Sequence, residues 1–316
     1  MKRYFLNKPM FIIVLCVIGF LTALKMIYYP SYQGNTPSYD ISVLCAKGDS
    51  EHFLNYRQGA LQAAEDLNVN LRFLYSKYED SVNHQIKLLQ QELKNDINAL
   101  IMIPYSDSFV LQQRCSEATK PIVYAYSHVI KGESNYIGSN GSALGVGFAN
   151  HIINEYQTKQ HIAILVKNDL THTEKEICES MQEQLRSQNH HVEVLSFHPQ
   201  ENTEHLHNLL NKNKFNIVVC FEDEFCSQLI AHKEIHDIEI YAMGSKYDVI
   251  SALEKEELHA LLVQDDYSIG YLSVKAAVDS LKNGENIVKQ NIRYAIVDKA
   301  QMYQSSNERL LFPIVR

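Results

Sequence analysis

The sequence predicts an α/β fold of two doubly wound parallel-sheet lobes with an inter-lobe cleft, preceded by one N-terminal transmembrane helix. From residue 39 onward, short apolar segments alternate with amphipathic segments of helical period. Strands that are apolar on both faces are typical of parallel sheets covered by helices. This alternation yields too many strands for one comfortable sheet, and its rhythm breaks once, near residue 139. An uncharged run close to the N-terminus adds the membrane helix.

Composition narrows the classes of protein to which the chain can belong. Its 316 residues are enough for two lobes and an appendage, and 46% hydrophobic residues can bury a sizeable core. A formal net charge of -8 argues against nucleic acid as the main partner. The six cysteines form no CxxC pair, so no disulfide framework is predicted. The 14 histidines include His190-His191 and His205-x-His207, but no carboxylate or Cys pattern matches them, so no metal site is predicted.

The N-terminal segment divides into a membrane helix and a linker. Basic residues precede the uncharged run Met10–Leu24. The segment 10–29 reaches the roughly 20 residues of a membrane span if Lys25 snorkels to the interface. No A-x-A cleavage site follows it. We therefore predict that residues 1–29 are an uncleaved, single-pass signal anchor in the cell membrane, and that the linker 30–38 leads to an extracytoplasmic globular part.

The globular part is predicted to alternate between strands and helices throughout. In lobe 1, residues 39–138 plus 265–290, the strands are Asp40–Ala46, Leu71–Tyr75, Ala99–Ile103, Pro121–Tyr126 and a short one ahead of Gly138, and the helices are Glu51–Leu67, Ser81–Leu93, Asp107–Ala118 and Ile269–Leu281. In lobe 2, residues 139–264 plus 291–316, the strands are Ile162–Val166, Val192–Ser196, Asn216–Cys220, Ile238–Met243, Ala260–Val263 and Ile292–Val297. The helices of lobe 2 are one running towards Tyr156, Thr173–Ser187, Thr203–Leu210, Glu224–His232 and Tyr247–Glu254. The tail from Asn307 to Ile314 is predicted to lie back on a lobe.

The stretch Asn135–Gly145 is predicted to be a crossing between the lobes. It runs from an apolar strand through a polar turn into a helix, with Gly138 for a sharp turn and Ser139 or Asn140 as the helix cap. Such a turn can present backbone N–H groups to a polar ligand, or it can be plain turn chemistry, and both interpretations stay open. Because ligands of open α/β sheets bind beyond the carboxyl ends of the strands, the loops that follow each strand are the expected cleft.

Five motifs follow one another along the chain: Phe53 with Tyr56-Arg57-Gln58-Gly59-Ala60, Asp96–Pro104, Tyr136–Asn140 with Gly145, Cys220–Glu224, and Val263–Tyr271. In this order they resemble the type I periplasmic binding proteins of the ribose-binding family, and the resemblance extends from Tyr39 to about Val297. It implies two lobes that close on a sugar, with Phe53 over the sugar ring and Gln264 facing the ligand.

The polar residues that hold a sugar in that family are largely replaced in this chain. Where the family has an Asp-Arg pair, this chain has Tyr126 and Ser127, and where the family has an Arg it has Ile177. Glu222 and Ser50 each occupy the position of an Asn, and Lys246 occupies the position of an acidic residue. Carboxylate and Arg contacts are what hold the hydroxyl groups there, so the identity of the sugar does not carry over. A Glu222/Lys246 pair is a candidate replacement for the lost contacts.

The predicted ligand-binding residues are Ser50, Phe53, Tyr105, Tyr126, Ser127, Glu222, Lys246 and Gln264. All but Ser127 have a second interpretation, which for Ser50 is a helix cap. Gln264 can cap backbone instead of facing a ligand, and Phe53 can belong to the core. The tyrosines can be ordinary surface residues, and Glu222 with Lys246 can be an exposed ion pair of little energetic consequence.

Functionally, the sequence predicts a solute-binding protein and no enzyme. The chain has no GxSxG, Walker, HExxH or dinucleotide motif, so we expect no catalytic residues and no cofactor. The expected ligand is small, polar and carbohydrate-like, and the expected partner is the membrane permease of an ABC importer or a sensor histidine kinase of a two-component system. The alternative is a protein-interaction module on a binding-protein scaffold without a small ligand.

Overall fold

The computed structural model describes residues 39–46, 53–76, 81–129, 135–197, 203–231, 238–284 and 290–312. The predicted signal anchor and linker, residues 1–38, lie outside these ranges, and so does Ser50. Within the ranges given, no helix is long and apolar enough to cross a membrane.

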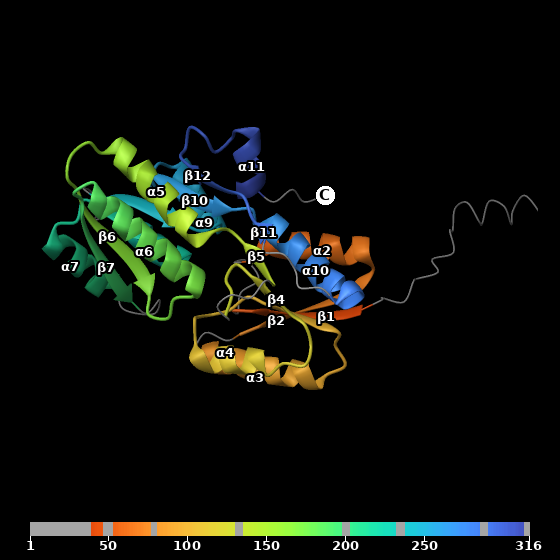
Figure 1. Ribbon diagram of the computed structural model, residues 1–316. Coiled ribbons are helices and arrows are strands. Elements are labelled where there is room, and N and C mark those ends of the chain that lie inside the picture. The colour runs from red at the N-terminus through yellow and green to blue at the C-terminus, as the bar shows by residue number, and fades with distance from the viewer. Residues whose placement is uncertain are drawn as a thin grey trace, which may run out of the picture. The chain divides into compact units, whose positions relative to one another are not determined.

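The described chain builds two six-stranded sheets, one in each lobe (Figure 1). The lobe 1 sheet has the order β11-β5-β4-β3-β1-β2, from β1 (Tyr39–Cys45), β2 (Val69–Tyr75), β3 (Ala99–Met102), β4 (Ile122–Ala125), β5 (Tyr136–Gly138) and β11 (Gln290–Asn291). The lobe 2 sheet has the order β12-β10-β9-β8-β6-β7, from β6 (His161–Lys167), β7 (His191–Phe197), β8 (Ile217–Cys220), β9 (Glu239–Met243), β10 (Ala260–Gln264) and β12 (Tyr294–Val297).

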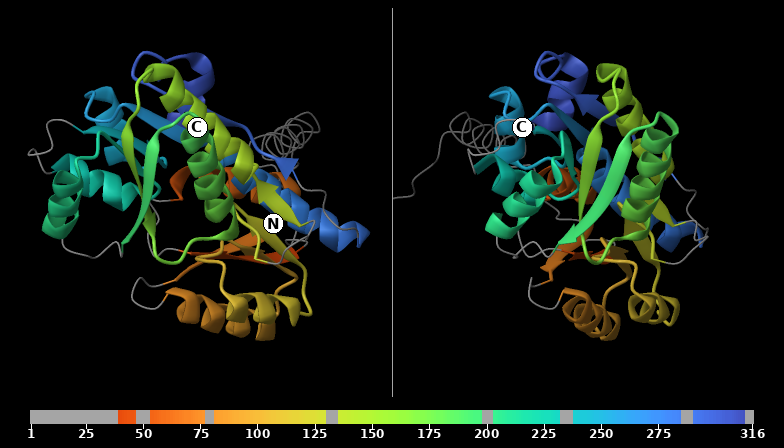
Figure 2. Two further views of the ribbon diagram at one scale, coloured as in Figure 1. Left: turned by 60° about the vertical axis from the view of Figure 1, so that its left-hand side comes forward. Right: turned by 90° about the vertical axis from the view of Figure 1, so that its left-hand side faces the viewer.

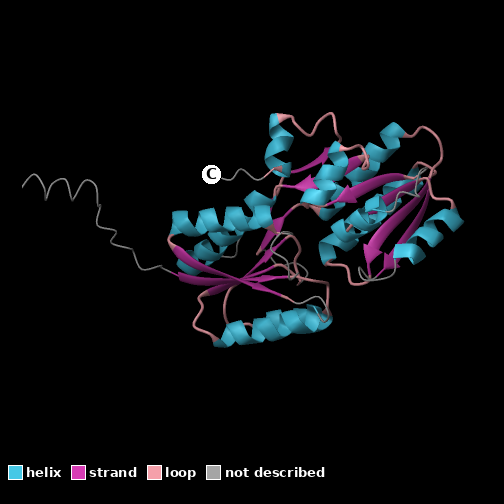
Figure 3. Cartoon of the chain, turned by 180° about the vertical axis from the view of Figure 1, so that it is seen from behind, coloured by secondary structure: helices cyan, strands magenta, loops and turns pink. Residues whose placement is uncertain are grey.

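Helices cover both faces of each sheet, as doubly wound folds require (Figure 3). In lobe 1, α3 (Ser81–Lys94) and α4 (Phe109–Ser116) pack on one face, and α2 (Leu54–Leu67) and α10 (Asp266–Asn283) on the other. In lobe 2, α5 (Gly141–Glu155) and α6 (His172–Ser187) lie side by side on one face (Figure 2). The other face carries α7 (Thr203–Asn213), α8 (Asp223–Ala231), α9 (Tyr247–Glu254) and α11 (Ser305–Leu311).

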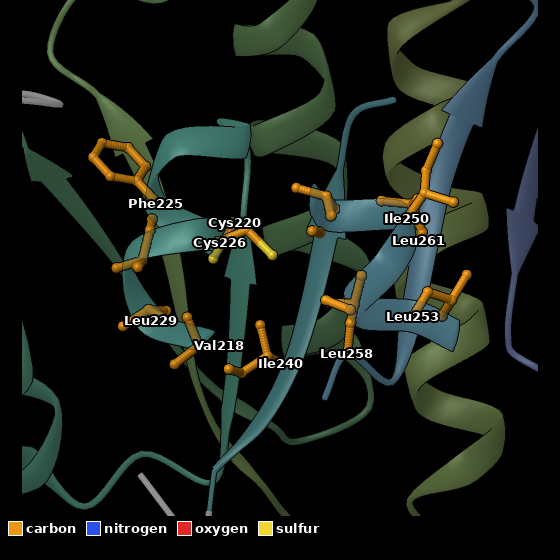
Figure 4. Close-up of a cluster of buried hydrophobic side chains, with 14 of the residues drawn as sticks. Val218, Cys220, Phe225, Cys226, Leu229, Ile240, Ile250, Leu253, Leu258 and Leu261 are labelled. Carbon is orange, nitrogen blue, oxygen red and sulfur yellow. The ribbon is translucent and has the colours of Figure 1, made fainter. Parts of the chain in front are cut away.

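The all-apolar strands are explained by this two-sided cover. In β3, Ala99 and Ile101 pack toward α2 and α10, whereas Leu100 and Met102 pack toward α3 and α4, as the two-residue period of a strand dictates. Lobe 2 repeats the arrangement: Val218 of β8 packs with the side chains of α8 and α9 shown in Figure 4. Every position of such a strand is buried, so apolar residues follow without interruption.

The predicted strands and helices form in the described part of the chain, with their ends shifted by a few residues, but one strand direction was not predicted. The predicted strand Ile292–Val297 corresponds to β12, which runs antiparallel to β10 of lobe 2, and the two-residue strand β11 just before it pairs with β5 of lobe 1. The connectivity explains the reversal. Strand β10 ends at the crossing into lobe 1, so the returning chain enters lobe 2 at that same end and must run backwards along β10.

Three chain crossings connect the lobes and are hydrogen-bonded to one another. Ser139 Oγ donates to the Ile292 carbonyl at 3.1 Å, and Asp265 N–H donates to the Arg293 carbonyl at 3.0 Å. Of the two predicted caps of α5, Asn140 performs that role, because its Oδ1 accepts from Ala143 N–H at 2.9 Å. The Asn135–Gly145 stretch is therefore part of a three-segment hinge.

The tail up to residue 312, where the described chain ends, lies back on lobe 2 as predicted, and Leu310 and Leu311 of α11 join the core. In lobe 1 the close packing of α2 against α10 depends on two glycines. A Cβ at Gly59 would lie 1.9 Å from the Tyr267 carbonyl oxygen, and one at Gly270 would lie 2.0 Å from the carbonyl oxygen of Tyr56. Residues with side chains would force these helices apart.

Candidate functional site

A cavity of about 170 Å³ lies between the lobes, at the carboxyl ends of both sheets. Pockets that hold drug-sized ligands have volumes of about 300–1,000 Å³, so this cavity is smaller. Its walls come from the loops after β3 and β4 in lobe 1, and from those after β6, β8 and β9 in lobe 2. The site therefore has room for one small molecule that contacts both lobes.

The lobe 1 wall is aromatic. Phe53, immediately before α2, and Tyr126, immediately after β4, line the cavity with ring centroids 6.1 Å apart. Tyr56 lies behind them, 5.7 Å from the Tyr126 ring and fully buried. The three rings form one cluster whose outer surface faces the cavity.

Tyr126 adopts a backbone conformation that side-chain-bearing residues rarely take, with a φ of 64°. Hydrogen bonds hold it there: Tyr126 N–H donates to the Ile137 carbonyl at 3.0 Å, and Tyr136 Oη donates to the Tyr126 carbonyl at 3.0 Å. Strained backbone of this kind clusters at ligand sites, where the surrounding structure keeps it in place. These hydrogen bonds therefore fix the backbone of Tyr126, and with it the position of the ring, at the cavity wall.

The lobe 2 wall is ionic. Lys167 Nζ lies 2.8 Å from Glu174 Oε1 and 3.0 Å from Glu222 Oε1, and the Lys167 side chain is only 7% exposed. The register of β6 against β8 brings Lys167 and Glu222 together. Leu165 of β6 pairs with Cys220 of β8, and Lys167 and Glu222 each stand two residues further on.

Glu174 is held by the start of α6 as well as by Lys167. Its Oε2 accepts from Thr171 N–H at 2.7 Å, and Thr171 Oγ1 accepts from Glu174 N–H at 3.3 Å, which is a capping box. One carboxylate oxygen therefore caps the helix while the other binds the ammonium group of Lys167. This division of contacts fixes the ionic wall on a rigid helix end.

The hinge side of the cavity contributes Gln264 and Asp266. Gln264 ends β10, and its side-chain Oε1 is buried without a hydrogen-bond partner among the residues that the structure describes. Asp266 begins α10 and accepts a hydrogen bond from Ser245 Oγ at 2.8 Å. Burial raises the pKa of Asp266 to about 6, against the lowering effect of hydrogen bonds from Ser245 and Tyr126.

Direct contacts also join the lobes at the mouth of the cavity. Thr173 N–H donates to Ser127 Oγ at 3.1 Å, and Asp107 N–H donates to the Leu170 carbonyl at 3.0 Å. Lys175 Nζ lies 3.1 Å from Asp107 Oδ2. The structure therefore shows the lobes closed against each other over the cavity.

The predicted site residues fall into three groups. Phe53, Tyr126, Ser127, Glu222 and Gln264 line the cavity, and Ser50 lies outside the described residues. Tyr105 and Lys246 are not among the described residues that line it. Tyr105 packs on the lobe 1 core, with its ring 5.7 Å from Lys167 Nζ.

The predicted Glu222/Lys246 pairing is wrong. Glu222 pairs with Lys167, and Lys246 pairs with Glu224 at 3.4 Å. Lys246 is the N-cap residue of α9, and its side chain reaches the first turn of α8 instead of the cavity. The ion pairs thus follow strand and helix neighbours that sequence spacing does not show.

Sequence reasoning did not select Lys167, Thr173, Glu174, Ser245 or Asp266. The sequence does contain a signal for Lys167 and another for Glu174. Lys167 follows directly on a fully apolar strand, and Thr171-His172-Thr173-Glu174 has the T-x-x-E pattern of a capping box.

The sequence matches the family model of the periplasmic binding protein domain over residues 41–286. No curated protein matches it. Among solved structures, a carbohydrate transporter solute-binding protein from Agrobacterium radiobacter, in complex with D-arabinose, is similar with a TM-score of 0.77 and 19% identity, over 87% of this chain and 99% of that one.

Two further solved structures share this architecture. An ABC transporter solute-binding protein from Agrobacterium vitis with bound D-fucose has a TM-score of 0.77 at 14% identity, covering 86% of this chain and 100% of its own. A glucose-galactose binding protein from Geobacillus stearothermophilus has a TM-score of 0.73 at 15% identity, covering 84% and 99%. At these identities the likeness establishes the fold alone.

Proposed function

This chain belongs to the periplasmic binding protein domain family, and from that premise we propose that it is a membrane-tethered, extracytoplasmic solute-binding protein that closes on a small, carbohydrate-like ligand. The observation that carries the proposal is the cavity between the lobes, with an aromatic wall on one side and an ionic wall on the other.

The two walls suit the two surfaces of a sugar. The apolar face of a pyranose or furanose ring packs on aromatic rings such as Phe53 and Tyr126. Its hydroxyl groups can donate hydrogen bonds to carboxylates and accept them from an ammonium group, and such charge-assisted bonds are about twice as strong as neutral ones. The buried Oε1 of Gln264 offers a further acceptor for a ligand hydroxyl. The sugars bound in similar solved structures, D-arabinose and D-fucose, support this ligand class.

Closure is the proposed output. A ligand that contacts both lobes binds the closed state more tightly than the open one, so it shifts the population toward closure. The three hinge crossings and the contacts at Asp107 and Ser127 are the elements on which this equilibrium acts. A membrane partner then recognises the closed surface.

Two membrane partners fit this output. Residues 10–29 would tether the protein, and the closed form would either deliver its ligand to the permease of an ABC importer or regulate a sensor histidine kinase. The permanent tether and the replacement of the sugar-binding Asp-Arg pair by Tyr126 and Ser127 favour signalling over delivery. Neighbouring genes for a permease and ATPase, or for a kinase and response regulator, discriminate between the two.

The proposal is tested by ligand titration of the full-length chain in mild detergent. Thermal unfolding is followed by circular dichroism with D-arabinose, D-fucose, other sugars, sugar phosphates, nucleosides and amino acids. A ligand at about 100 times its Kd stabilises the folded state by about 2.7 kcal/mol, which raises the melting temperature measurably.

Matched variants locate the site of any stabilising ligand. Gln264→Ala and Phe53→Ala are expected to abolish the shift, whereas Gln188→Ala, an exposed residue on the outer end of α6, should leave it intact. A folded protein that no compound stabilises would contradict the proposal and favour the protein-interaction alternative.

A further inference from the structure

Three side chains that the ligand cavity does not use converge at the far end of lobe 2. His161 is the first residue of β6, and His191 and Glu193 lie at the start of β7. The cavity lies beyond the other ends of these strands. At about 3.3 Å per residue, a seven-residue strand separates the two places by roughly 20 Å.

The donor atoms of the three side chains are within reach of one common ion. His161 Nε2 lies 2.9 Å and His191 Nε2 lies 3.2 Å from the same carboxylate oxygen, Glu193 Oε1. One ligand atom from each residue can be chosen so that all three lie within 4.8 Å of one another. Ligand atoms about 2.0–2.1 Å from a tetrahedral zinc ion stand about 3.3 Å apart, which is close to the two nitrogen–oxygen distances observed here.

The sheet fixes this arrangement. His161 pairs with His191 across β6 and β7, and Glu193 follows two residues later on the same face. His161 N–H donates to Asn216 Oδ1 at 3.0 Å, and His191 N–H donates to the Gln160 carbonyl at 2.8 Å. The strand ends are therefore anchored before any ion arrives, which is the preorganisation that a metal site requires.

The rings are restrained as well. The His161 ring lies 4.3 Å from Phe215 and 4.5 Å from His191, measured between centroids. The side chains are 25%, 57% and 41% exposed for His161, His191 and Glu193, so an ion can enter from solvent.

We propose that His161, His191 and Glu193 form a binding site for one divalent transition-metal ion of the zinc type. Imidazole nitrogens with one carboxylate suit Zn²⁺, Ni²⁺ and Cu²⁺. A neutral imidazole carries its proton on either nitrogen, so both Nε2 atoms can ligate while Nδ1 holds the proton. Three protein ligands leave at least one position for water.

The test uses the full-length chain without a histidine tag, stripped with EDTA and exchanged into metal-free buffer. Isothermal titration with Zn²⁺ is expected to show one site whose Kd rises more than about 10-fold in His161→Gln, His191→Gln and Glu193→Gln, because removing a ligand costs more than removing its supporting partner. The matched control is His84→Gln on α3 of lobe 1, which should leave that Kd unchanged. Equal Kd values in the wild type and the three variants would overturn the proposal.

Copper gives a readout that a merely structural cluster would not produce. Electron paramagnetic resonance of the Cu²⁺-loaded wild type should show splitting from two imidazole nitrogens, reduced to one in each histidine variant and kept at two in Glu193→Gln. A spectrum that none of the variants changes would place the ion elsewhere among the 14 histidines and overturn the assignment. The variants should still unfold at the wild-type temperature in metal-free buffer, since all three side chains are partly exposed.

Discussion

The two walls of the cavity are built on equivalent α/β lobes but differ in the type of side chain, which is aromatic in lobe 1 and charged in lobe 2. Lobe 1 presents the rings of Phe53 and Tyr126, which continue into its hydrophobic core through Tyr56. Lobe 2 presents Lys167 between two carboxylates, held by strand register and a helix cap.

The contrast shows that the same edge of a doubly wound sheet can stabilise its cavity wall in two ways. The aromatic wall is stable without a ligand because its rings bury apolar surface. The ionic wall exists only while each charge keeps its partner, since an uncompensated buried charge costs several kcal/mol. The lobes should therefore respond very differently to substitution and to pH.

The largest expected effect comes from removing the shared cation of lobe 2. Lys167→Met takes the ammonium group away from Glu174 and Glu222, and the latter side chain is 4% exposed. We expect the free energy of unfolding at pH 7 to fall by about 3 kcal/mol or more. Urea unfolding followed by circular dichroism measures it, and adding Glu222→Gln to the same chain should recover part of the loss.

Two controls make this a test of the comparison between the lobes. Lys175→Met removes a cation that is 43% exposed and should cost less than about 1 kcal/mol. Phe53→Leu keeps the lobe 1 wall apolar and should cost less than about 1.5 kcal/mol. If Lys167→Met is no more destabilising than these variants, the ionic wall is no more sensitive to substitution than the aromatic wall.

The second prediction concerns Asp266, at the hinge end where the walls meet. Its folded-state pKa is about 6 against an ordinary 3.8, so between pH 4 and 6 the native state holds a proton that the unfolded state has lost. Stability should therefore fall as pH rises through this window, by about 2 kcal/mol for this group. Urea midpoints of the wild type and of Asp266→Asn, measured from pH 4 to 7, isolate the contribution.

The stability of Asp266→Asn relative to the wild type should rise across this window and level off above it. Asn keeps a hydrogen-bond acceptor for Ser245 Oγ, which makes it a close structural match. A difference that does not depend on pH would mean that the Asp266 carboxyl group is not desolvated.

Sequence patterns were sufficient for the fold because apolar strands and amphipathic helices are local features. Asp40–Ala46, for example, differs from the observed β1 by a single residue at each end. The aromatic wall was predicted in part for a similar reason, since Phe53 stands inside a motif whose neighbours fix its place at the start of α2.

The pairing of charges in the ionic wall could not be predicted because it depends on strand order. Lys167 and Glu222 meet only because β6 and β8 are neighbours with Leu165 opposite Cys220. Nothing in the spacing along the chain determines that adjacency. The wrong pairing of Glu222 with Lys246 has the same cause, since both follow strands but those strands, β8 and β9, direct them to different partners. The reversed strand β12 likewise follows from connectivity instead of local pattern.

The smallest predicted effect lies at the mouth of the cavity, where Asp107 of lobe 1 meets Lys175 of lobe 2 at 3.1 Å. Burial opposes ionisation of Asp107, but hydrogen bonds from Lys175 and Gln112 prevail and lower its pKa below 3.8. Its contribution is therefore present above pH 4 and lost as pH falls through the folded-state pKa, the opposite sense to Asp266. Asp107→Asn should cost about 0.5–1 kcal/mol at pH 7. Because this contact joins the lobes, the variant should also have a larger radius of gyration in small-angle X-ray scattering without ligand. An unchanged radius would mean that the hinge and Ser127 hold the lobes closed without it.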